Sequence, residues 1–414
     1  MINFDRFQLS NGLTVIVNHD PNTPIVAMNI LYKVGSRDES IRRTGFAHLF
    51  EHLMFGGSEN IPKYDVPLEK SGGENNAFTN ADYTNYYLTI PKNNLEVAFW
   101  LESDRMNNLA FSIKSLNIQK QVVIEEFKQN YLNQPYGESY LLLKPLAYKK
   151  HPYRWITIGK DIKQIDNASL DYVKKFYYKY YNPNNAILTI SGDVSTSEIK
   201  ELSEKWFGPI KSGEAIAHDY PMEPVQKRRR IKIIERDVPQ SAVYMAWHMP
   251  RRTTKEYYHC DLISDILSNG KSSRLYRKLV IDKSLVSDIN AFISGDENPG
   301  LFIVIAKLLD GVDTNKAIDA INNELADIAT NLIKESELEK VKNKIESNLL
   351  FSQSSVLTKA MNLAYFEFLG DANKINEEYN IYENIDRNSI LSTAKNLFKG
   401  NNQNILIYNK NSKK

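Results

Sequence analysis

Residues 45–57 read GFAHLFEHLMFGG, and their hydrophobic spacing is that of an α-helix. Apolar side chains recur at intervals of three and four residues: Ala47, Leu49, Phe50, Leu53 and Met54. This repeat is typical of a helix with one buried face. Thr44 is the predicted N-cap, and Gly56 with Gly57 predicts the end of the helix.

Two histidines of this helix are placed to act together. His48 and His52 lie one turn apart, so both imidazoles are expected on one face, with Glu51 beside them. Catalytic zinc sites commonly combine two histidines, one carboxylate and an open position for water. The order His-x-x-Glu-His is the inverzincin pattern, so Glu51 is the predicted general base rather than a metal ligand.

The same residues also have a purely structural interpretation. A histidine on an apolar helix face is often a satisfied core residue, and Glu51 is compatible with a solvent-facing position. However, burying two imidazoles and a carboxylate without partners is costly. Their place among apolar neighbours therefore favours a metal site.

The third ligand is expected from another helix. The stretch SLNIQKQVVIEEFKQN, which begins at Ser115, offers Glu125 and Glu126 side by side. Periodicity does not choose between them. One is expected to face the metal, and the other to face solvent or a supporting partner.

The segments around this helix alternate between strand and helix patterns. Asn11-Gly12 and Asn80 to Asp82 are predicted hairpin turns, each between two strands. A strand is predicted from Ile25, two long helices at 94–108 and 112–133, and a further strand near residue 190. The later half repeats this plan loosely, with predicted strands in RRIKIIER, SAVYMAWHM, LVSDINAFIS, LFIVIAKLL and NILIYN and helices between them.

This pattern predicts an α+β fold of two similar domains, each a mostly antiparallel sheet with helices packed on one face. The zinc-binding catalytic domain is predicted at 1–210, and a similar domain without a metal site at 231–414. The segment 211–230 between them is rich in Gly, Pro and charge, which is typical of a linker. It ends in the basic run Lys227 to Arg230, which is interpreted as a solvated connector.

Composition narrows the classes of partner and compartment. The 414 residues are 42% hydrophobic and 25% charged, and the formal net charge is only +2. That balance gives no reason to expect nucleic acid or a membrane as the main partner. Cys260, the single cysteine, is predicted to be a small core residue of a helix. One cysteine fits a reducing compartment, and the N-terminal residues do not resemble a targeting peptide, so a cytoplasmic location is expected.

Several motifs resemble the insulinase/pitrilysin family of zinc metallopeptidases, and in particular its two-domain bacterial members related to the mitochondrial processing peptidase. The motifs are GFAHLFEHLMFGGSEN, SGGENNAFTNADYTNYYLTI, VVIEEFKQN, NPNNAILTISGDV and SNGKSSRLYRKL, spread over nearly the whole chain. The resemblance implies one zinc ion per chain, with His48, His52 and Glu126 as its ligands and Glu51 as the base. It implies an endopeptidase that acts on unfolded peptides or oligopeptides.

The resemblance also implies where the substrate binds. The stretch NNAFT looks like the family's exposed edge strand, to which an extended peptide adds as a further strand. Asn76, Ala77 and Phe78 are the residues that this comparison points to. An ordinary hairpin strand explains the same alternation, so the substrate interpretation depends on the resemblance.

One departure from the family pattern changes the expected assembly. Active members carry an Arg and, seven residues later, a Tyr that hold the substrate, whereas the corresponding positions here are Val280 and Ser287. Neither side chain supplies a cation or a phenol. The chain thus resembles the metal-bearing subunit of a heterodimer in which a metal-free homologous subunit supplies the pair. A metal-binding but noncatalytic structural subunit and, more weakly, a peptide-binding chaperone are the alternatives.

Overall fold

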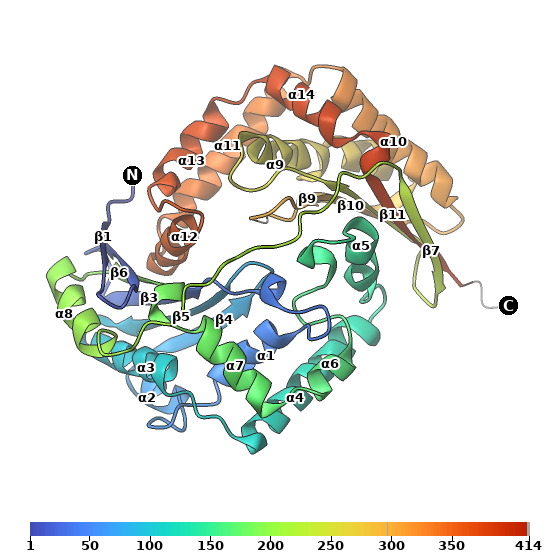
Figure 1. Ribbon diagram of the computed structural model, residues 1–414. Helices are drawn as coiled ribbons and strands as arrows, with labels where there is room; N and C mark the ends of the chain where they lie inside the picture. Colours follow the sequence, from blue (N-terminus) through green and yellow to red (C-terminus); the bar gives the residue numbers. More distant parts are fainter. Residues whose placement is uncertain (296, 412–414) are drawn as a thin grey trace. The chain divides into compact units, whose positions relative to one another are not determined.

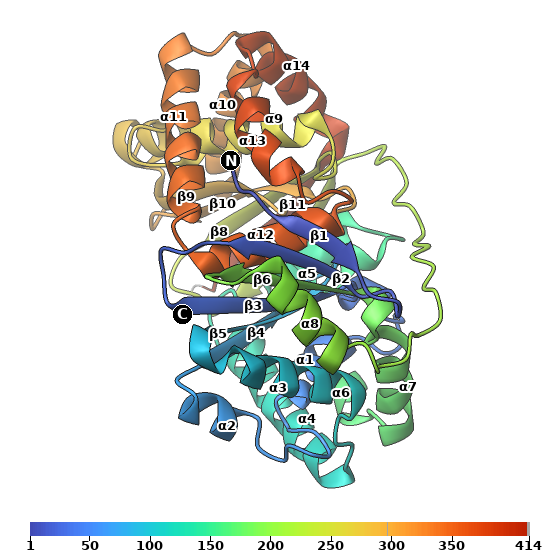
Figure 2. The same cartoon turned by 90° about the vertical axis from the view of Figure 1, so that its left-hand side faces the viewer.

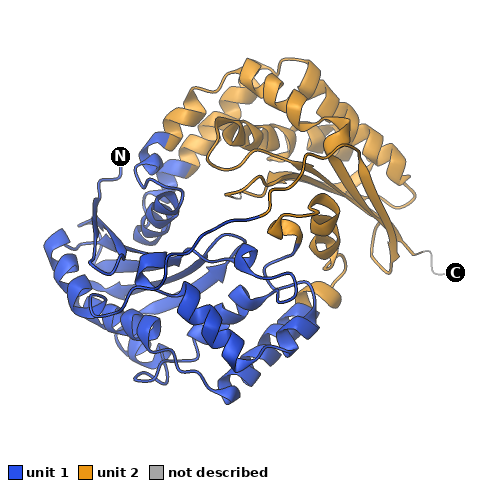
Figure 3. Ribbon diagram, in the orientation of Figure 1, with its two compact units in different colours: residues 1–128, 155–220, 349–377 blue, residues 129–154, 221–348, 378–414 orange. Residues whose placement is uncertain are grey.

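The computed structural model describes residues 1–295 and 297–411, and they form two compact units (Figure 3). Unit 1 contains Met1–Lys128, Trp155–Tyr220 and Leu349–Glu377, and unit 2 contains Gln129–Arg154, Pro221–Asn348 and Glu378–Lys414. Each unit combines one sheet with helices, so the predicted α+β class with two sheets is confirmed.

Unit 1 is built on a six-stranded sheet with the strand order β1-β2-β6-β3-β5-β4. In sequence order the strands are β1 Asp5–Gln8, β2 Thr14–His19, β3 Ile25–Tyr32, β4 Glu74–Thr79, β5 Thr84–Pro91 and β6 Ala186–Gly192. Only the pair β2 and β6 is parallel among these strands; the other neighbours are antiparallel. The predicted hairpins at Asn11-Gly12 and Asn80 to Asp82 are confirmed.

Most helices of unit 1 lie on one face of this sheet, and α12 lies on the other (Figures 1 and 2). The helices are α1 Phe46–Met54, α2 Asp65–Lys70, α3 Leu95–Asn107, α4 Ile113–Phe127, α6 Ile162–Asp166, α7 Leu170–Tyr180, α8 Thr196–Trp206 and α12 Val356–Phe368. On β3, Ala27 and Leu31 pack with buried residues of α12. Helices on both faces explain why β3 is buried along nearly its whole length.

Unit 2 contains a five-stranded sheet with the order β7-β11-β8-β10-β9. Its strands are β7 Arg230–Arg236, β8 Ala242–His248, β9 Val286–Ile293, β10 Leu301–Leu308 and β11 Gln403–Lys410. Its helices include α5 Ser139–Ala147, α9 Lys255–Ser268, α10 Thr314–Thr330 and α14 Arg387–Leu397, while α11 Glu335–Ser352 and α13 Lys374–Glu383 run across the unit boundary. Cys260 is buried in α9, as predicted, and burial raises the pKa of its thiol to about 12.

Short helical segments complete the described chain. The 3-10 segments are Ser36–Asp38, Lys92–Asn94, Pro152–Arg154, Pro183–Asn185 and Gly400–Asn402, and the π-helical segments are Lys128–Leu132 and Tyr276–Asp282. The predicted helix at 112–133 is therefore α4 followed by a π-helical end. Across residues 1–295 and 297–411, we find no helix with both the length and the hydrophobicity that crossing a bilayer requires.

Each unit contains a helix that comes from the other half of the chain. Helix α5, from the earlier half of the chain, packs on β8 and β11 of unit 2, and α12, from the later half, packs on β3 and β6 of unit 1. The compact units are therefore discontinuous, whereas the sequence predicts continuous domains at 1–210 and 231–414. Those boundaries stay a prediction about how the chain is organised.

Candidate active site

The start of α1 is fixed by a buried carboxylate. Gly45 precedes the helix with a φ of +88°, in the left-handed region that favours glycine. Glu39 accepts the backbone N–H groups of Gly45 at 2.9 Å and of Ala47 at 2.8 Å, so it satisfies donors that a helix start leaves free. The predicted N-cap at Thr44 is wrong, because the Thr44 hydroxyl donates to Oε1 of Gln164 at 2.7 Å instead.

The structure brings three of the predicted site residues together within unit 1. His48 and His52 project from α1, and Glu126 projects from α4. Oε2 of Glu126 lies 3.7 Å from Nε2 of His48 and 3.4 Å from Nε2 of His52. In residues 1–295 and 297–411, these side chains form the one group of three or more His, Cys, Asp and Glu residues with ligand atoms all within 4.8 Å of one another.

Two of the three separations between these atoms are close to those of a tetrahedral zinc site. Ligands at about 2.0–2.2 Å from zinc lie about 3.3–3.6 Å from one another in a tetrahedron. The nitrogen-to-oxygen separations of 3.7 and 3.4 Å are close to this edge length. Two imidazole nitrogens and one carboxylate oxygen leave the fourth position for water, as catalytic zinc sites do.

The charge states of the ligands also suit a cation. Burial lowers the pKa of His48 to about 4, so its ring is neutral near pH 7, the form that binds a metal. The hydrogen bond with His52 lowers the pKa of Glu126, against the opposing effect of burial. Glu126 is therefore a carboxylate at the same pH.

The structure shows which of the two adjacent glutamates, Glu125 or Glu126, faces the histidines. The carboxylate of Glu126 faces the imidazoles, whereas Oε1 of Glu125 lies 2.7 Å from Nζ of Lys128. The Glu125 side chain is 66% exposed, so it faces solvent. Of the two, only Glu126 is placed to reach a metal between His48 and His52.

Glu51 lies beside the two histidines on α1, and Thr79 holds its carboxylate. Oγ1 of Thr79, the last residue of β4, donates to Oε2 of Glu51 at 2.6 Å. Burial raises the pKa of Glu51, while the Thr79 hydrogen bond and the nearby His52 lower it. A raised pKa suits a general base that works near neutral pH. No sequence pattern singles out Thr79, because only the fold brings the end of β4 to α1.

A buried cation of α3 likewise has no sequence signal. Arg105 is 2% exposed, and its guanidinium donates to both carboxylate oxygens of Glu102, at 2.7 and 2.8 Å. The rings of Tyr64 and Tyr86 lie 4.6 and 4.5 Å from its Cζ atom. Since Tyr86 pairs with Ala77 across β5 and β4, this cluster supports the hairpin that carries Thr79. An arginine within a helix pattern gives no local signal of such burial.

The predicted substrate residues lie on an edge strand. Strand β4 ends the sheet of unit 1, so in the described chain one of its sides has no strand neighbour. Asn76, Ala77 and Phe78 pair on the other side with Tyr87, Tyr86 and Asn85 of β5. The free side of β4 is the side on which strand addition takes place. The backbone N–H of Ala77 donates to Oδ1 of Asn76 at 2.8 Å.

The two positions that the resemblance assigns to the family's Arg/Tyr pair lie in unit 2. Val280 is in the π-helical segment Tyr276–Asp282, and Ser287 is the second residue of β9. The Ser287 hydroxyl donates to Oε1 of Gln240 at 2.9 Å. Both residues are therefore ordinary parts of the local structure.

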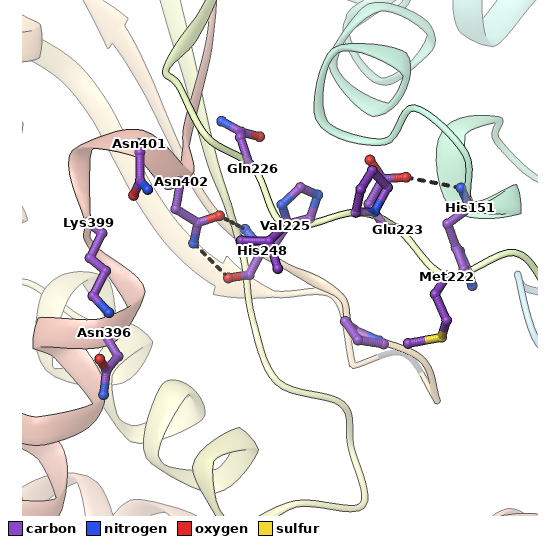
Figure 4. A pocket seen from close by; sticks show the side chains of 12 residues that line it. His151, Met222, Glu223, Val225, Gln226, His248, Asn396, Lys399, Asn401 and Asn402 are labelled. Carbon is purple, nitrogen blue, oxygen red and sulfur yellow. Dashed lines mark hydrogen bonds between the residues drawn. The ribbon is translucent and has the colours of Figure 1, made fainter.

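A cavity of about 380 Å³ in unit 2 contains none of the predicted site residues (Figure 4). Glu223 lines it and accepts backbone N–H groups of Lys149, Lys150 and His151 at 2.8 to 3.0 Å. Asn402 also lines the cavity. Its Oδ1 accepts the backbone N–H of His248, and its Nδ2 donates to the backbone carbonyl oxygen of His248. None of His48, Glu51, His52 and Glu126 lines this cavity, so we assign it no role in the reaction.

Two family models match the chain. The model described as Insulinase (Peptidase family M16) matches residues 14–150, which include His48, Glu51, His52 and Glu126. The model described as Peptidase M16 inactive domain matches residues 167–345. The two halves of the chain thus match the two successive parts of one peptidase class.

Named relatives agree with these models. The chain is 33% identical to "Zinc protease PqqE" of Helicobacter pylori over 81% of this chain and 76% of that protein. It is 25% identical to "Probable mitochondrial-processing peptidase subunit beta" of Schizosaccharomyces pombe over 84% of this chain and 78% of that protein. The crystal structure of a protease from Helicobacter pylori matches with a TM-score of 0.93 and 28% identity, covering 99% of this chain and all of that one.

The fold, the His48, His52 and Glu126 cluster and these relatives together define the class as zinc proteases. The chain belongs to the insulinase/pitrilysin family, so the resemblance seen in its motifs is confirmed.

Proposed function

We propose that the chain is a zinc-dependent endopeptidase that hydrolyses unfolded peptides or oligopeptides. The observation that carries this proposal is that Nε2 of His52 and Nε2 of His48 lie 3.4 and 3.7 Å from Oε2 of Glu126. Glu51 lies on α1 together with the two histidines. His48, His52 and Glu126 would hold one zinc ion per chain. A bound zinc ion supplies Lewis acidity, which polarises a peptide carbonyl and makes water a stronger acid.

The protein residues then move the proton. Glu51 takes the proton of the attacking water through its carboxylate and passes it to the nitrogen of the leaving amine. Its Oε2 already accepts a hydrogen bond from Thr79, so we assign this proton to Oε1.

Metal removal tests the proposed function. Treating the full chain with a chelator is expected to abolish cleavage of an unstructured, quenched fluorescent peptide, and added zinc is expected to restore it. Metal analysis of the same samples gives the zinc content at each step. Unchanged cleavage by a chain shown to hold no metal would contradict the proposal.

We propose further that the substrate adds to β4 as an extended strand alongside Asn76, Ala77 and Phe78. The support is the edge position of β4 and its place beside α1. In an extended strand only alternate residues point their N–H groups at the neighbour. The backbone bonds would select unfolded chains over folded ones.

Methylated peptides test this strand addition. Two versions of one substrate peptide are compared. The first carries backbone N-methyl groups on its odd-numbered residues, and the second carries them on its even-numbered residues. One version is expected to have a KM about tenfold higher per lost hydrogen bond, since such a bond contributes up to about 1.5 kcal/mol, and the other is expected to bind nearly normally. Equal KM values for both versions would refute strand addition.

The missing cation and phenol at Val280 and Ser287 support a heterodimer with a metal-free homologous subunit. A donor to the developing oxyanion is worth about two to three orders of magnitude in rate. The isolated chain is therefore expected to be slow, and kcat is expected to rise by at least about 100-fold when the partner is added. An isolated chain that works at full speed, with no gain from a homologous subunit, would exclude the heterodimer.

The same two positions favour the second candidate, a metal-binding but noncatalytic subunit of a larger assembly. Retention of Glu51 beside the two histidines argues for catalysis, because a structural metal site has no use for a base. Stoichiometric zinc without turnover, alone or with the partner, would support the noncatalytic candidate. A cytoplasmic location stays a prediction, based on the lone cysteine and on N-terminal residues that do not resemble a targeting peptide.

A further inference from the structure

The carboxylate of Glu51 depends on a single side chain for its orientation. In the described residues, the Thr79 hydroxyl is the one hydrogen-bond donor recorded to this carboxylate, at 2.6 Å between Oγ1 and Oε2. Both residues are partly buried. A glutamate side chain has several rotatable bonds, so one well-placed donor decides where its free oxygen points.

Thr79 itself is held rigidly. It pairs with Thr84 at the last register position of the β4–β5 hairpin, next to the turn. That turn is closed by Asn80, whose Oδ1 accepts the N–H groups of Asp82 and Tyr83 at 2.8 Å each. A β-branched side chain also has few rotamers. The direction of the Thr79 hydroxyl is therefore set by the hairpin.

Strand geometry links this hydroxyl to the proposed peptide strand. Successive side chains of a strand point to opposite faces, so Thr79 shares its face with Ala77 and not with Asn76 or Phe78. Strand β4 packs on α1, and the Thr79 contact shows that this shared face is the one toward α1. One strand thus provides both the free edge for the peptide and the hydroxyl that holds the base.

We infer that Thr79 is a positioning residue for Glu51: its hydroxyl fixes Oε2 of the carboxylate so that Oε1 faces the reacting water. This inference rests on the proposed peptidase function. Thr79 keeps its proton throughout, because it only donates a hydrogen bond. Because Thr79 belongs to β4, this hydrogen bond fixes the position of the base relative to a peptide bound along the same strand.

Substitution of Thr79 tests the inference through the split between kcat and KM. Thr79→Val keeps the size and the branching but removes the hydroxyl. It is expected to lower kcat by about 10- to 100-fold, the usual effect of losing an orienting group, while KM stays within about twofold and the zinc content is unchanged. Thr79→Ser, which keeps the hydroxyl, is expected to restore most of kcat.

A second threonine provides a matched control. Thr89 lies on β5 of the same hairpin, and its hydroxyl donates to Glu74 at 3.3 Å. Thr89→Val therefore removes the same kind of contact away from α1 and is expected to leave kcat unchanged. Wild-type kcat in Thr79→Val, or an equal loss in Thr79→Val and Thr79→Ser, would overturn the inference.

A thermal double-mutant cycle on the full, zinc-loaded chain tests the contact without using activity. Thr79→Val is expected to lower Tm in the wild-type background, because it leaves a partly buried carboxylate without its donor. In the Glu51→Ala background the same change is expected to have little effect on Tm. Additive changes in Tm would overturn the Thr79 inference, whereas a coupled Tm in a chain that cleaves no peptide would count against the peptidase function alone.

Discussion

Glu51→Gln is expected to abolish peptide cleavage while the chain keeps one zinc ion. The amide of glutamine cannot take a proton from water, and general base catalysis contributes about 10²- to 10⁴-fold in rate. The zinc content is expected to stay near one, because the proposed ligands are His48, His52 and Glu126. Cleavage of a quenched peptide and metal analysis on the same preparation measure both effects.

Glu59→Gln is a suitable control for this variant. Glu59 is an exposed carboxylate in the loop that follows α1, so its loss is expected to change neither cleavage nor zinc content. If Glu51→Gln cleaves the peptide at the wild-type rate, Glu51 is not the general base. If it loses zinc, Glu51 belongs among the ligands.

Glu126→Gln is expected to weaken zinc binding by at least about 100-fold, which exceeds the usual effect of losing a residue that only supports a ligand. The substitution replaces a carboxylate oxygen, 3.4 Å from the nearer imidazole nitrogen, by a neutral amide of almost the same shape. Activity is expected to fall with zinc occupancy. Competition against a chelator of known affinity measures the change.

The neighbouring residue gives a matched control. Glu125→Gln makes the same chemical change one position earlier, on a side chain that is 66% exposed and paired with Lys128. Zinc affinity is expected to stay within about twofold of wild type. An equal loss of affinity in both variants would mean that the charge of this helix, rather than the Glu126 ligand, controls metal binding.

The local parts of the site could be predicted from the sequence. The helix at residues 46–54 follows from its hydrophobic repeat, and a helix alone is enough to put His48, Glu51 and His52 side by side. Both hairpin turns and the strand from Ile25 also follow from the sequence, because turn residues and alternation act over a few positions.

The long-range parts of the site could not be predicted in this way. Glu125 and Glu126 sit on one helix, and periodicity cannot tell which of two adjacent side chains faces a distant element. Glu39 at the start of α1 and Thr79 beside Glu51 depend on contacts that only the fold creates. The packing of α12 on the sheet of unit 1 also joins residues far apart in the chain.

The central claim is that His48, His52 and Glu126 hold one zinc ion beside Glu51. Anomalous diffraction from crystals of the zinc-loaded chain, collected on both sides of the zinc absorption edge, tests it most directly. We expect one strong zinc peak within about 2.2 Å of Nε2 of both histidines and of a Glu126 oxygen. A peak at other residues, or no peak in a chain that still cleaves peptides, would contradict the account.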